Sequence, residues 1–262
     1  LLGSDNGGTV TPTDASVTPP KTTFFNTNPG NAADLGMLHI KSGDSGASVS
    51  STSDELVIEG SSVGMSFLDA TDGATRIAFG DSGDNDIGKI VYGHSSNQME
   101  FVTNTATGLV ISSDGEVTKP LQPSFRVGNG TQNNIATSTN HTVIFSQEVF
   151  DIGSNFDTST YTFTAPVTGK YFFNAMFRIE ALDTGSSYLQ VVLMGSNRNT
   201  TMFTLSEIQH HMSADSEISF SGATVLDMDA NDTAYLRIRI QAGTAQADIS
   251  TDGSYFTGYL IG

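Results

Sequence analysis

An apolar pattern with a period of two residues is the feature that most constrains this chain. In residues 171–180 one face is wholly apolar, and residues 235–240 repeat the pattern with Leu236, Ile238 and Ile240 on one side. A period of two is that of a half-buried β-strand. Similar runs occupy residues 143–145, 161–163, 188–194, 218–220 and 256–261. Because no helical pattern separates these strands, we predict an antiparallel sandwich of about eight to ten strands.

Residues 35–123 carry shorter apolar runs, bounded by turn formers such as Asp72-Gly73 and Asp114-Gly115. The runs are residues 38–41, 56–59, 63–68, 76–79, 90–92, 99–102 and 109–111. Strands at this spacing with turn signals between them indicate an all-β module. The runs are short and Ser/Gly-rich for a self-sufficient core, so we predict a β-rich shaft that packs against copies of itself.

Residues 1–34 are rich in Thr, Ser, Asn, Gly and Pro, and only Phe24 and Phe25 break the polarity. Such a segment buries too little surface to offset its ordering entropy. We therefore predict an extended N-terminal tether, which serves either as a surface anchor for the chain's own fold or as a docking peptide for a larger assembly.

Composition excludes several classes of function. The 262 residues carry a net charge of −17, and a field of that sign repels nucleic acid and anionic membranes. The chain has no cysteine, which excludes disulfides, a thiol nucleophile and Cys-ligated zinc. No apolar run approaches the roughly 20 residues of a spanning helix. We therefore expect no nucleic-acid partner and no membrane insertion.

The aromatic spacing in residues 145–173 resembles the C1q family, the trimeric jelly-roll domain related to tumour necrosis factor. The matching positions are Phe145, Asp151, Phe156, Phe163, Gly169, Tyr171 and Phe173. Ala175 stands where the family has a further aromatic, and the family's closing strand is matched by residues 256–261 with Gly258. The resemblance covers residues 124–262 and implies a homotrimeric jelly-roll knob.

The preceding segment resembles the shaft of a bacteriophage tail fibre, in the phrases at residues 45–49, 54–60, 73–80 and 108–117. The two resemblances together imply an all-β homotrimeric fibre located on the virion, and extracellular after release. Its parts are a tether (1–34) that contacts other virion tail proteins, a shaft (35–123) and a C1q-like knob (124–262).

Motifs for catalysis are weak. Gly-Asp-Ser-Gly at residues 43–46 and 80–83 resembles the nucleophile turn of serine proteases. A triad also needs a histidine base and an acid, and His39 and His94 belong to no partner motif, so turns between strands are the preferred interpretation. The metalloprotease helix motif, a phosphate-cradling loop and a dinucleotide fingerprint are missing. We predict that the protein is not an enzyme.

A bound calcium ion is left as an alternative to a protein without cofactors. Asp227, Asp229 and Asn231 start like an EF-hand loop, but Asp232 and Ile238 occupy the positions that need Gly and Glu. Asp227, Asp229 and Asp232 of three chains around one axis are therefore the calcium candidates. The adjacent His210 and His211 point to opposite faces if they lie on a strand, so one strand cannot aim both at one metal.

The preferred hypothesis is a fibre whose knob recognises a host-surface receptor, a glycan such as lipopolysaccharide or a protein, by multivalent binding. Aromatic, amide, Arg and His side chains in loops are the candidate contacts: Tyr188, Asn197, Arg198, Asn199, His210 and His211. Alternation gives the expected trimer core: Tyr171, Tyr235, Phe256 and Tyr259. The alternatives are a purely structural virion fibre, a secreted C1q-like lectin or signalling ligand, and a glycan-cleaving enzyme.

Overall fold

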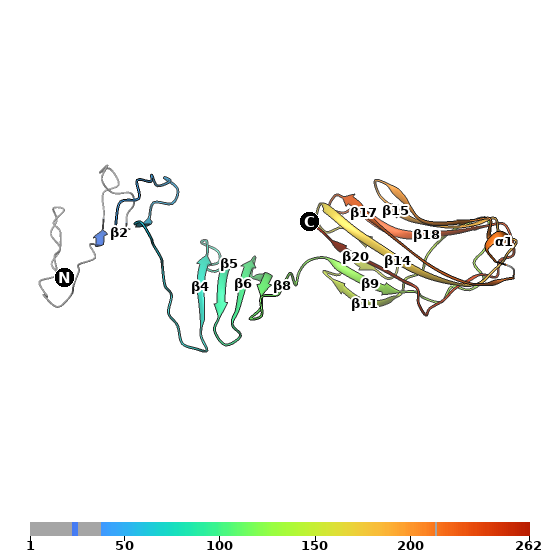
Figure 1. Cartoon of the computed structure of the whole chain (residues 1–262), viewed down its shortest axis with the longest axis horizontal. Coiled ribbons are helices and arrows are strands. Elements are labelled where there is room, and N and C mark those ends of the chain that lie inside the picture. Colours follow the sequence, from blue (N-terminus) through green and yellow to red (C-terminus); the bar gives the residue numbers. More distant parts are fainter. Residues whose placement is uncertain (1–22, 26–37, 213) are drawn as a thin grey trace, which may run out of the picture. The chain divides into compact units, whose positions relative to one another are not determined.

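The structure, a computed structural model, describes residues 23–25, 38–212 and 214–262 (Figure 1). These residues form twenty β-strands and one helix of four residues, so the all-β prediction is confirmed. The chain divides into two compact units, residues 1–69 and residues 70–262. This boundary lies inside the segment predicted as the shaft.

The first unit contains a three-stranded sheet of β1 (Thr23–Phe25), β2 (Leu38–Lys41) and β3 (Leu56–Glu59). Strand β2 pairs antiparallel with β1 and parallel with β3. Within the predicted tether, β1 is the only part among the described residues; the rest of residues 1–34 lies outside them. Thr23–Phe25 is therefore a short strand within the segment predicted as an extended tether.

Residues 63–68, predicted as a strand, pair with no other strand of the described residues. Their apolar side chains are largely exposed, including Met65 at 55%, Phe67 at 49% and Leu68 at 95%. The apolar run is present as predicted, but a strand needs a neighbour to bond with, and the described part of one chain does not supply one.

The second unit begins with an antiparallel meander, a single sheet in the order β4-β5-β6-β7-β8. Its strands are β4 (Ala74–Phe79), β5 (Gly88–Gly93), β6 (Gln98–Thr103), β7 (Ala106–Ile111) and β8 (Val117–Thr118). Asn104 and Thr105, between β6 and β7, both have positive φ, 49° and 63°. Two such residues in succession form the tight hairpin turn whose twist matches that of the strands.

Residues 124–262 form a sandwich of two six-stranded antiparallel sheets, in agreement with the predicted jelly roll. The β14 sheet has the order β11-β9-β20-β14-β17, with β19 beside β14. It comprises β9 (Ser124–Gly128), β11 (Gln147–Ile152), β14 (Gly169–Leu182), β17 (Ser216–Met228), β19 (Asp248–Ile249) and β20 (Tyr255–Leu260). The strand count exceeds the expected eight to ten because pieces as short as β19 pair at the margins.

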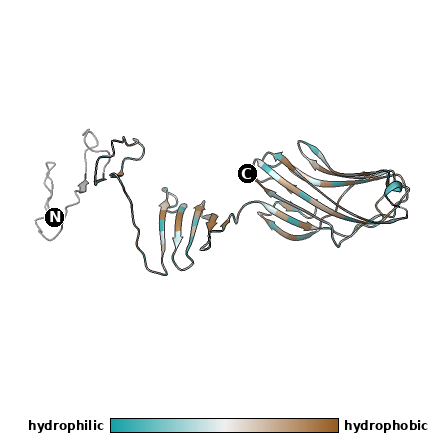
Figure 2. Cartoon of the chain, in the orientation of Figure 1, coloured by the Kyte–Doolittle hydropathy of each residue, from teal (hydrophilic) through white to brown (hydrophobic). Residues whose placement is uncertain are grey.

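The β18 sheet has the order β12-β13-β18-β15-β16, with β10 beside β18. It comprises β10 (Asn140–Thr142), β12 (Phe156–Asp157), β13 (Thr162–Thr164), β15 (Tyr188–Gly195), β16 (Asn199–Ser206) and β18 (Thr233–Gln241). Hydropathy changes from residue to residue along these strands (Figure 2), as alternation between a buried and an outer face requires.

Aromatic rings fill the space between the two sheets. Phe125 is fully buried, and its ring centroid lies 4.9 Å from that of Phe156, 5.1 Å from Phe163 and 5.0 Å from Phe256. A Cβ on Gly258 would lie 2.8 Å from Cε1 of Phe125 and 2.7 Å from the Phe173 ring. The close approach of these rings therefore requires glycine at position 258.

Residues 143–145 were predicted as a strand, but they cross from one sheet to the other. The Val143 N–H donates to Leu236 O at 2.9 Å, on the β18 sheet, whereas Ile144 O accepts from Gly130 N at 2.8 Å, beside the β14 sheet. Val143 and Phe145 are fully buried. The apolar run therefore reflects burial, and the change of partner prevents a continuous ladder.

Candidate functional site

The sandwich has two different ends (Figure 1). Its first strand begins beside the C-terminus, because Leu260 N donates to Pro123 O at 3.0 Å and Lys170 N donates to Gly262 O at 2.8 Å. We call this the N/C end. The opposite end carries α1 (Ile208–His211) together with the loops 129–139, 183–187 and 242–247, and we call it the α1 end.

The six residues predicted to contact a receptor divide between these ends. Tyr188, at the start of β15, lies with His210 and His211 at the α1 end, where Glu207 N donates to Ser187 O at 2.9 Å. Asn197, Arg198 and Asn199 follow the other end of β15, at the N/C end. The eight residues of β15 span about 23 Å. One small ligand therefore cannot contact both groups on the same chain.

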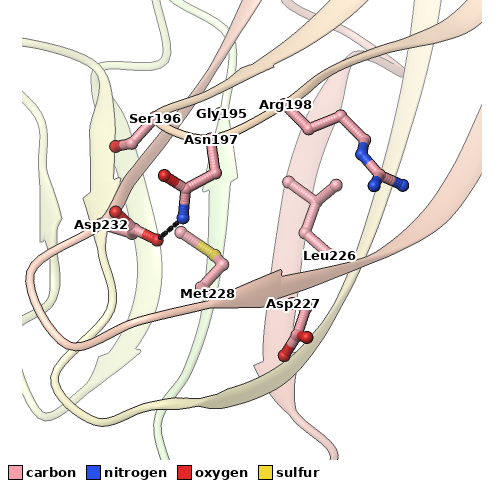
Figure 3. Close-up of a pocket in the computed structure, with 8 residues that line it drawn as sticks. All are labelled: Gly195, Ser196, Asn197, Arg198, Leu226, Asp227, Met228 and Asp232. Carbon is pink, nitrogen blue, oxygen red and sulfur yellow. Dashed lines mark hydrogen bonds between the residues drawn. The ribbon is translucent and has the colours of Figure 1, made fainter.

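A small pocket lies at the N/C end, between the β15–β16 turn and β17 (Figure 3). Its lining is Gly195, Ser196, Asn197, Arg198, Leu226, Asp227, Met228 and Asp232. Asp232 Oδ2 accepts a hydrogen bond from Asn197 Nδ2 at 2.6 Å, and Ser196 Oγ lies 3.0 Å from Thr233 Oγ1. The cavity volume is about 10 Å³, space for one water molecule at most. A sugar ring does not fit inside it.

The calcium candidates are placed at this same end. Asp232 Oδ2 also accepts from the Asp229 N–H at 2.8 Å, so this carboxylate oxygen already stabilises the turn between β17 and β18. No group of three or more metal-ligating side chains occurs among residues 23–25, 38–212 and 214–262. In one chain, Asp229 and Asp232 thus belong to a hydrogen-bonded turn, and Asp227 lies in β17 before it.

At the α1 end, the short helix is held by one buried side chain and exposes its histidines. Ile208 is fully buried, and Glu207 before it has a left-handed backbone conformation with φ of 55°. His210 and His211 are exposed, and His210 Nδ1 lies 3.2 Å from Glu207 Oε2. This arrangement presents both rings to solvent on a backbone that is anchored in the core.

Two aspartates, which sequence reasoning missed, stabilise the neighbouring loops. Asp183 accepts from the backbone N–H groups of Gly185 and Thr244, and these bonds hold the pKa of its carboxyl below the ordinary value. Asp215 accepts from Thr184 N at 3.0 Å and Gln246 Nε2 at 2.7 Å, and its pKa is lowered for the same reason. These carboxylates connect three loops, so the α1 end is a preorganised surface.

The first Gly-Asp-Ser-Gly turn does not have protease geometry. The N–H and Oγ of Ser45 both donate to Glu59 Oε1, at 2.8 and 3.1 Å, whereas His39 Nε2 lies 2.9 Å from Glu59 Oε2. The carboxylate therefore lies between serine and histidine, although a triad needs the histidine in the middle. The hydrogen bonds from the backbone and side chain of Ser45, together with the charge of Lys41, lower the pKa of Glu59 to about 2.

The second Gly-Asp-Ser-Gly turn also has a structural role, because its aspartate binds backbone N–H groups. Asp81 Oδ1 accepts from the N–H groups of Gly83 and Asp84 at 2.7 and 2.9 Å, and these bonds lower the pKa of the Asp81 carboxyl. A Cβ on Gly80 would lie 2.2 Å from Asn85 O. The motif is a tight loop between β4 and β5, as the preferred interpretation held.

Comparison with known sequences decides the family. The sequence model of the C1q domain matches residues 124–261, more than half of the chain. The chain belongs to the C1q domain family. None of the curated proteins matches it.

Solved structures similar to this chain include C1q and tumour-necrosis-factor-like proteins. The globular domain of zebrafish complement 1qA is 21% identical with a TM-score of 0.40, and covers 54% of this chain and 98% of its own. Murine APRIL, at pH 5.0 and at pH 8.0, is 17% identical with a TM-score of 0.39, and covers 53% of this chain and 99% of its own.

Membership of the family has direct consequences. C1q domains assemble as trimers, bind ligands without catalysing a reaction and are usually extracellular or secreted. No helix in the part of this chain that the structure describes is long and apolar enough to span a membrane.

The signature positions of the C1q domain serve its core. Phe145, Phe156, Phe163, Tyr171 and Phe173 are all at most 5% exposed. Asp151 Oδ2 accepts from Phe156 N at 2.8 Å and so fixes the turn between β11 and β12. A Cβ on Gly169 would lie 2.8 Å from the Leu260 side chain. Ala175, in place of the family's further aromatic, is 1% exposed and also lies in the core.

The four residues expected at the trimer axis do not form one cluster, which corrects the prediction. Tyr171 and Phe256 are fully buried within one C1q domain, between its sheets, and have no surface for a neighbouring chain. Tyr235 lies on the outer face of the β18 sheet and Tyr259 on the outer face of the β14 sheet. Alternation identifies which residues share a face, but it does not reveal which face is covered by the other sheet.

Tyr259 instead belongs to an apolar row on the outer face of the β14 sheet. Phe172 of β14 is paired with Val225 of β17 on one side and with Tyr259 of β20 on the other. Val225 is 48% exposed and Tyr259 47%, and the rings of Phe172 and Tyr259 lie 5.2 Å apart. Sequence reasoning missed Phe172 and Val225, although an aromatic on the polar face of residues 171–180 was a visible signal.

Toward the α1 end the same outer face becomes charged. Arg178 Nη2 lies 2.8 Å from Glu217 Oε2 and 3.4 Å from Glu180 Oε1, and its Nη1 lies 3.5 Å from Asp252. The hydrogen bond to Glu217 raises the pKa of Arg178. The apolar half of this face is therefore the half next to the N/C end.

Proposed function

We propose that this chain is a homotrimeric fibre protein of a virion, a bacteriophage tail fibre, whose C1q domain binds a host-surface receptor through its α1 end. One observation carries the proposal: the chain enters the C1q domain at the N/C end, and the anchored histidines and Asp-linked loops lie at the other. A knob on a fibre needs its contact surface away from its attachment, and loops on a rigid scaffold are where binding residues concentrate.

The apolar row on the β14 sheet supports the trimer. Val225, Phe172 and Tyr259 expose more apolar surface than an isolated domain needs, and burial of such surface against neighbouring chains is favourable at about 25 cal/mol per Å². We assign this row to the contacts around the threefold axis of the C1q domain. Of the four residues predicted in the trimer core, Tyr259 also belongs to this proposed contact.

Trimerisation determines how such a fibre would bind. Three α1 ends on one rigid knob present three copies of Tyr188, His210 and His211, and linked sites raise apparent affinity by about 10²–10⁴ when they engage together. The exposed imidazole groups of His210 and His211 and the half-buried phenol of Tyr188 suit the hydroxyl-rich surface of a bacterial glycan or lipopolysaccharide. The N-terminal segment, most of which lies outside the described residues, is assigned to docking on other virion tail proteins.

Binding of the full chain to immobilised lipopolysaccharides and capsular polysaccharides tests this function. We expect binding to at least one glycan, and we expect His210→Ala with His211→Ala to weaken it by about 10-fold or more. The matched control is Asn197→Ala with Arg198→Ala at the N/C end, which should bind like the unmodified chain.

Two results would contradict the proposal. Equal loss in both double variants would mean that the α1 end is not the contact surface. Absence of binding to every glycan and to intact host cells would leave a purely structural virion fibre, which shares the trimer but has no receptor.

A further inference from the structure

The meander of β4 to β8 has two chemically different faces. In antiparallel pairing, residues directly opposite one another lie on the same face of a sheet. Four such residues form an unbroken apolar row, in which Ile77 pairs with Ile90, Ile90 with Phe101 and Phe101 with Leu109. A parallel row contains Tyr92, Met99, Ile111 and Val117. We call the surface formed by these two rows the shaft face.

The opposite face of the meander is polar by comparison. Arg76 pairs with Val91 and Val91 with Glu100, and the neighbouring position in β5 is Lys89. Glu100 accepts hydrogen bonds from Thr107 Oγ1 at 3.0 Å and Gln98 Nε2 at 2.5 Å, and Lys89 pairs with Asp86 at 2.6 Å. The polar side chains of this face make hydrogen bonds and an ion pair, so the face is stable in contact with water. The shaft face, in contrast, carries no charged side chain in either row.

The shaft face is uncovered in a single chain. Ile77 is 40% exposed, Phe101 39% and Val117 59%, and Phe79, beside Ile77 on the same face, is 56% exposed. Among described residues 70–123, Val102 is the only apolar side chain less than 9% exposed. A sheet one layer thick needs a second layer over its apolar face to be stable in water.

We propose that the shaft faces of three copies of this chain pack against one another as a three-sided prism, a trimer contact separate from that of the C1q domain. The inference rests on the trimer of the proposed function. Only residues 119–123 separate β8 from β9, and five residues span at most about 18 Å. A trimeric C1q domain therefore holds three meanders close together, at an effective concentration of about millimolar.

Charge selects this face for contact between copies. Each chain carries −17, so three copies repel one another unless they meet through a surface without charge. The shaft face is such a surface, whereas the opposite face would bring three copies of Glu100 and Arg76 together. Packing also removes the apolar surface that would otherwise promote aggregation.

Cysteine cross-linking in the full chain tests this contact, because the natural sequence has no cysteine. Phe101→Cys places one thiol in the central strand β6 on the shaft face, and Glu100→Cys places it one residue away on the opposite face. The reagent is a bismaleimide that spans about 10 Å, the spacing of packed sheets. Ile90→Cys and Val91→Cys repeat the comparison on β5. Mass is measured for each variant before cross-linking.

We expect Phe101→Cys and Ile90→Cys to form covalently linked chains at least about 10-fold faster than Glu100→Cys and Val91→Cys, because packed faces lie about 10 Å apart and outer faces much farther. Trimeric mass with equally slow cross-linking in all four variants would overturn the prism and leave the trimer intact. Faster cross-linking on the opposite face would also overturn it. Monomeric mass would instead overturn the proposed function on which the inference rests.

Discussion

Replacement of Phe125 by alanine should destabilise the C1q domain by about 3–5 kcal/mol, because a fully buried aromatic ring leaves a cavity that its neighbours fill only in part. Phe125 is fully buried and contacts the rings of Phe156, Phe163, Phe173 and Phe256. Phe125 lies inside one continuous cluster of rings, in which Phe173 and Phe256 also have four aromatic neighbours each. Its removal therefore loses packing on both sheets at once.

Urea unfolding of the full chain, followed by tyrosine fluorescence at one fixed protein concentration, measures this effect. Concentration must be fixed because trimer formation contributes to apparent stability. The control is Phe150→Ala in the edge strand β11, where the ring is 43% exposed, and its loss should be below about 1 kcal/mol. If the two variants lost stability equally, the aromatic cluster would not be the core of this domain.

Aspartate at both Val225 and Tyr259 should raise the dissociation constant of the trimer by about a thousandfold or more. The substitutions place two charges per chain in the apolar row of the β14 sheet, and like charges brought together without water cost several kcal/mol, at about 1.4 kcal/mol per tenfold. Neither side chain belongs to the core of one domain, since both are about half exposed in the single chain. The fold of each C1q domain should therefore survive.

Sedimentation of the full chain over a range of concentrations measures the dissociation, and circular dichroism checks the fold. Thr204→Asp, an exposed position on the β18 sheet, is the matched control and should keep the trimer. An unchanged dissociation constant in the double variant would assign the threefold contact to another face. Loss of the trimer in the control would mean that added charge alone, regardless of its place, causes dissociation.

The fold of the C-terminal half could be predicted because its signal is local. Alternation in residues 171–180 arises because β14 is paired on both sides and turns one face toward the core along this stretch. The spacing of Phe145, Asp151, Phe156 and Phe163 identified the family for a related reason. These residues surround one turn and one cluster of rings, so their spacing is constrained by packing.

Which candidate residues lie at the same end of the sandwich could not be predicted, because this depends on where each strand reverses direction. Arg198 and His210 are only 12 positions apart, yet they lie at opposite ends of the sandwich. Residues 199–206 were not among the predicted strands, but they form β16, which runs antiparallel to β15 and carries the chain back to the α1 end. The apolar pattern in the sequence of an edge strand is weak, because such a strand pairs with a neighbour on one side only and is less completely covered by the core.

The register of the strands, meaning which residues pair across each sheet, also could not be predicted from the sequence patterns. The row of Val225, Phe172 and Tyr259 comes from three strands that are far apart in the chain and adjacent in the sheet. The shaft face likewise required the pairing of five strands before its apolar rows became visible. In both cases the individual residues were ordinary members of short apolar runs.

The mass of the full chain in solution, measured by light scattering at low protein concentration, shows whether the protein is a trimer. We expect a value near three times the 27.6 kDa of one chain, because both the β14 row and the shaft face need neighbouring copies. A mass of 27.6 kDa at micromolar concentration would contradict the trimeric fibre and leave the C1q domain as an isolated sandwich.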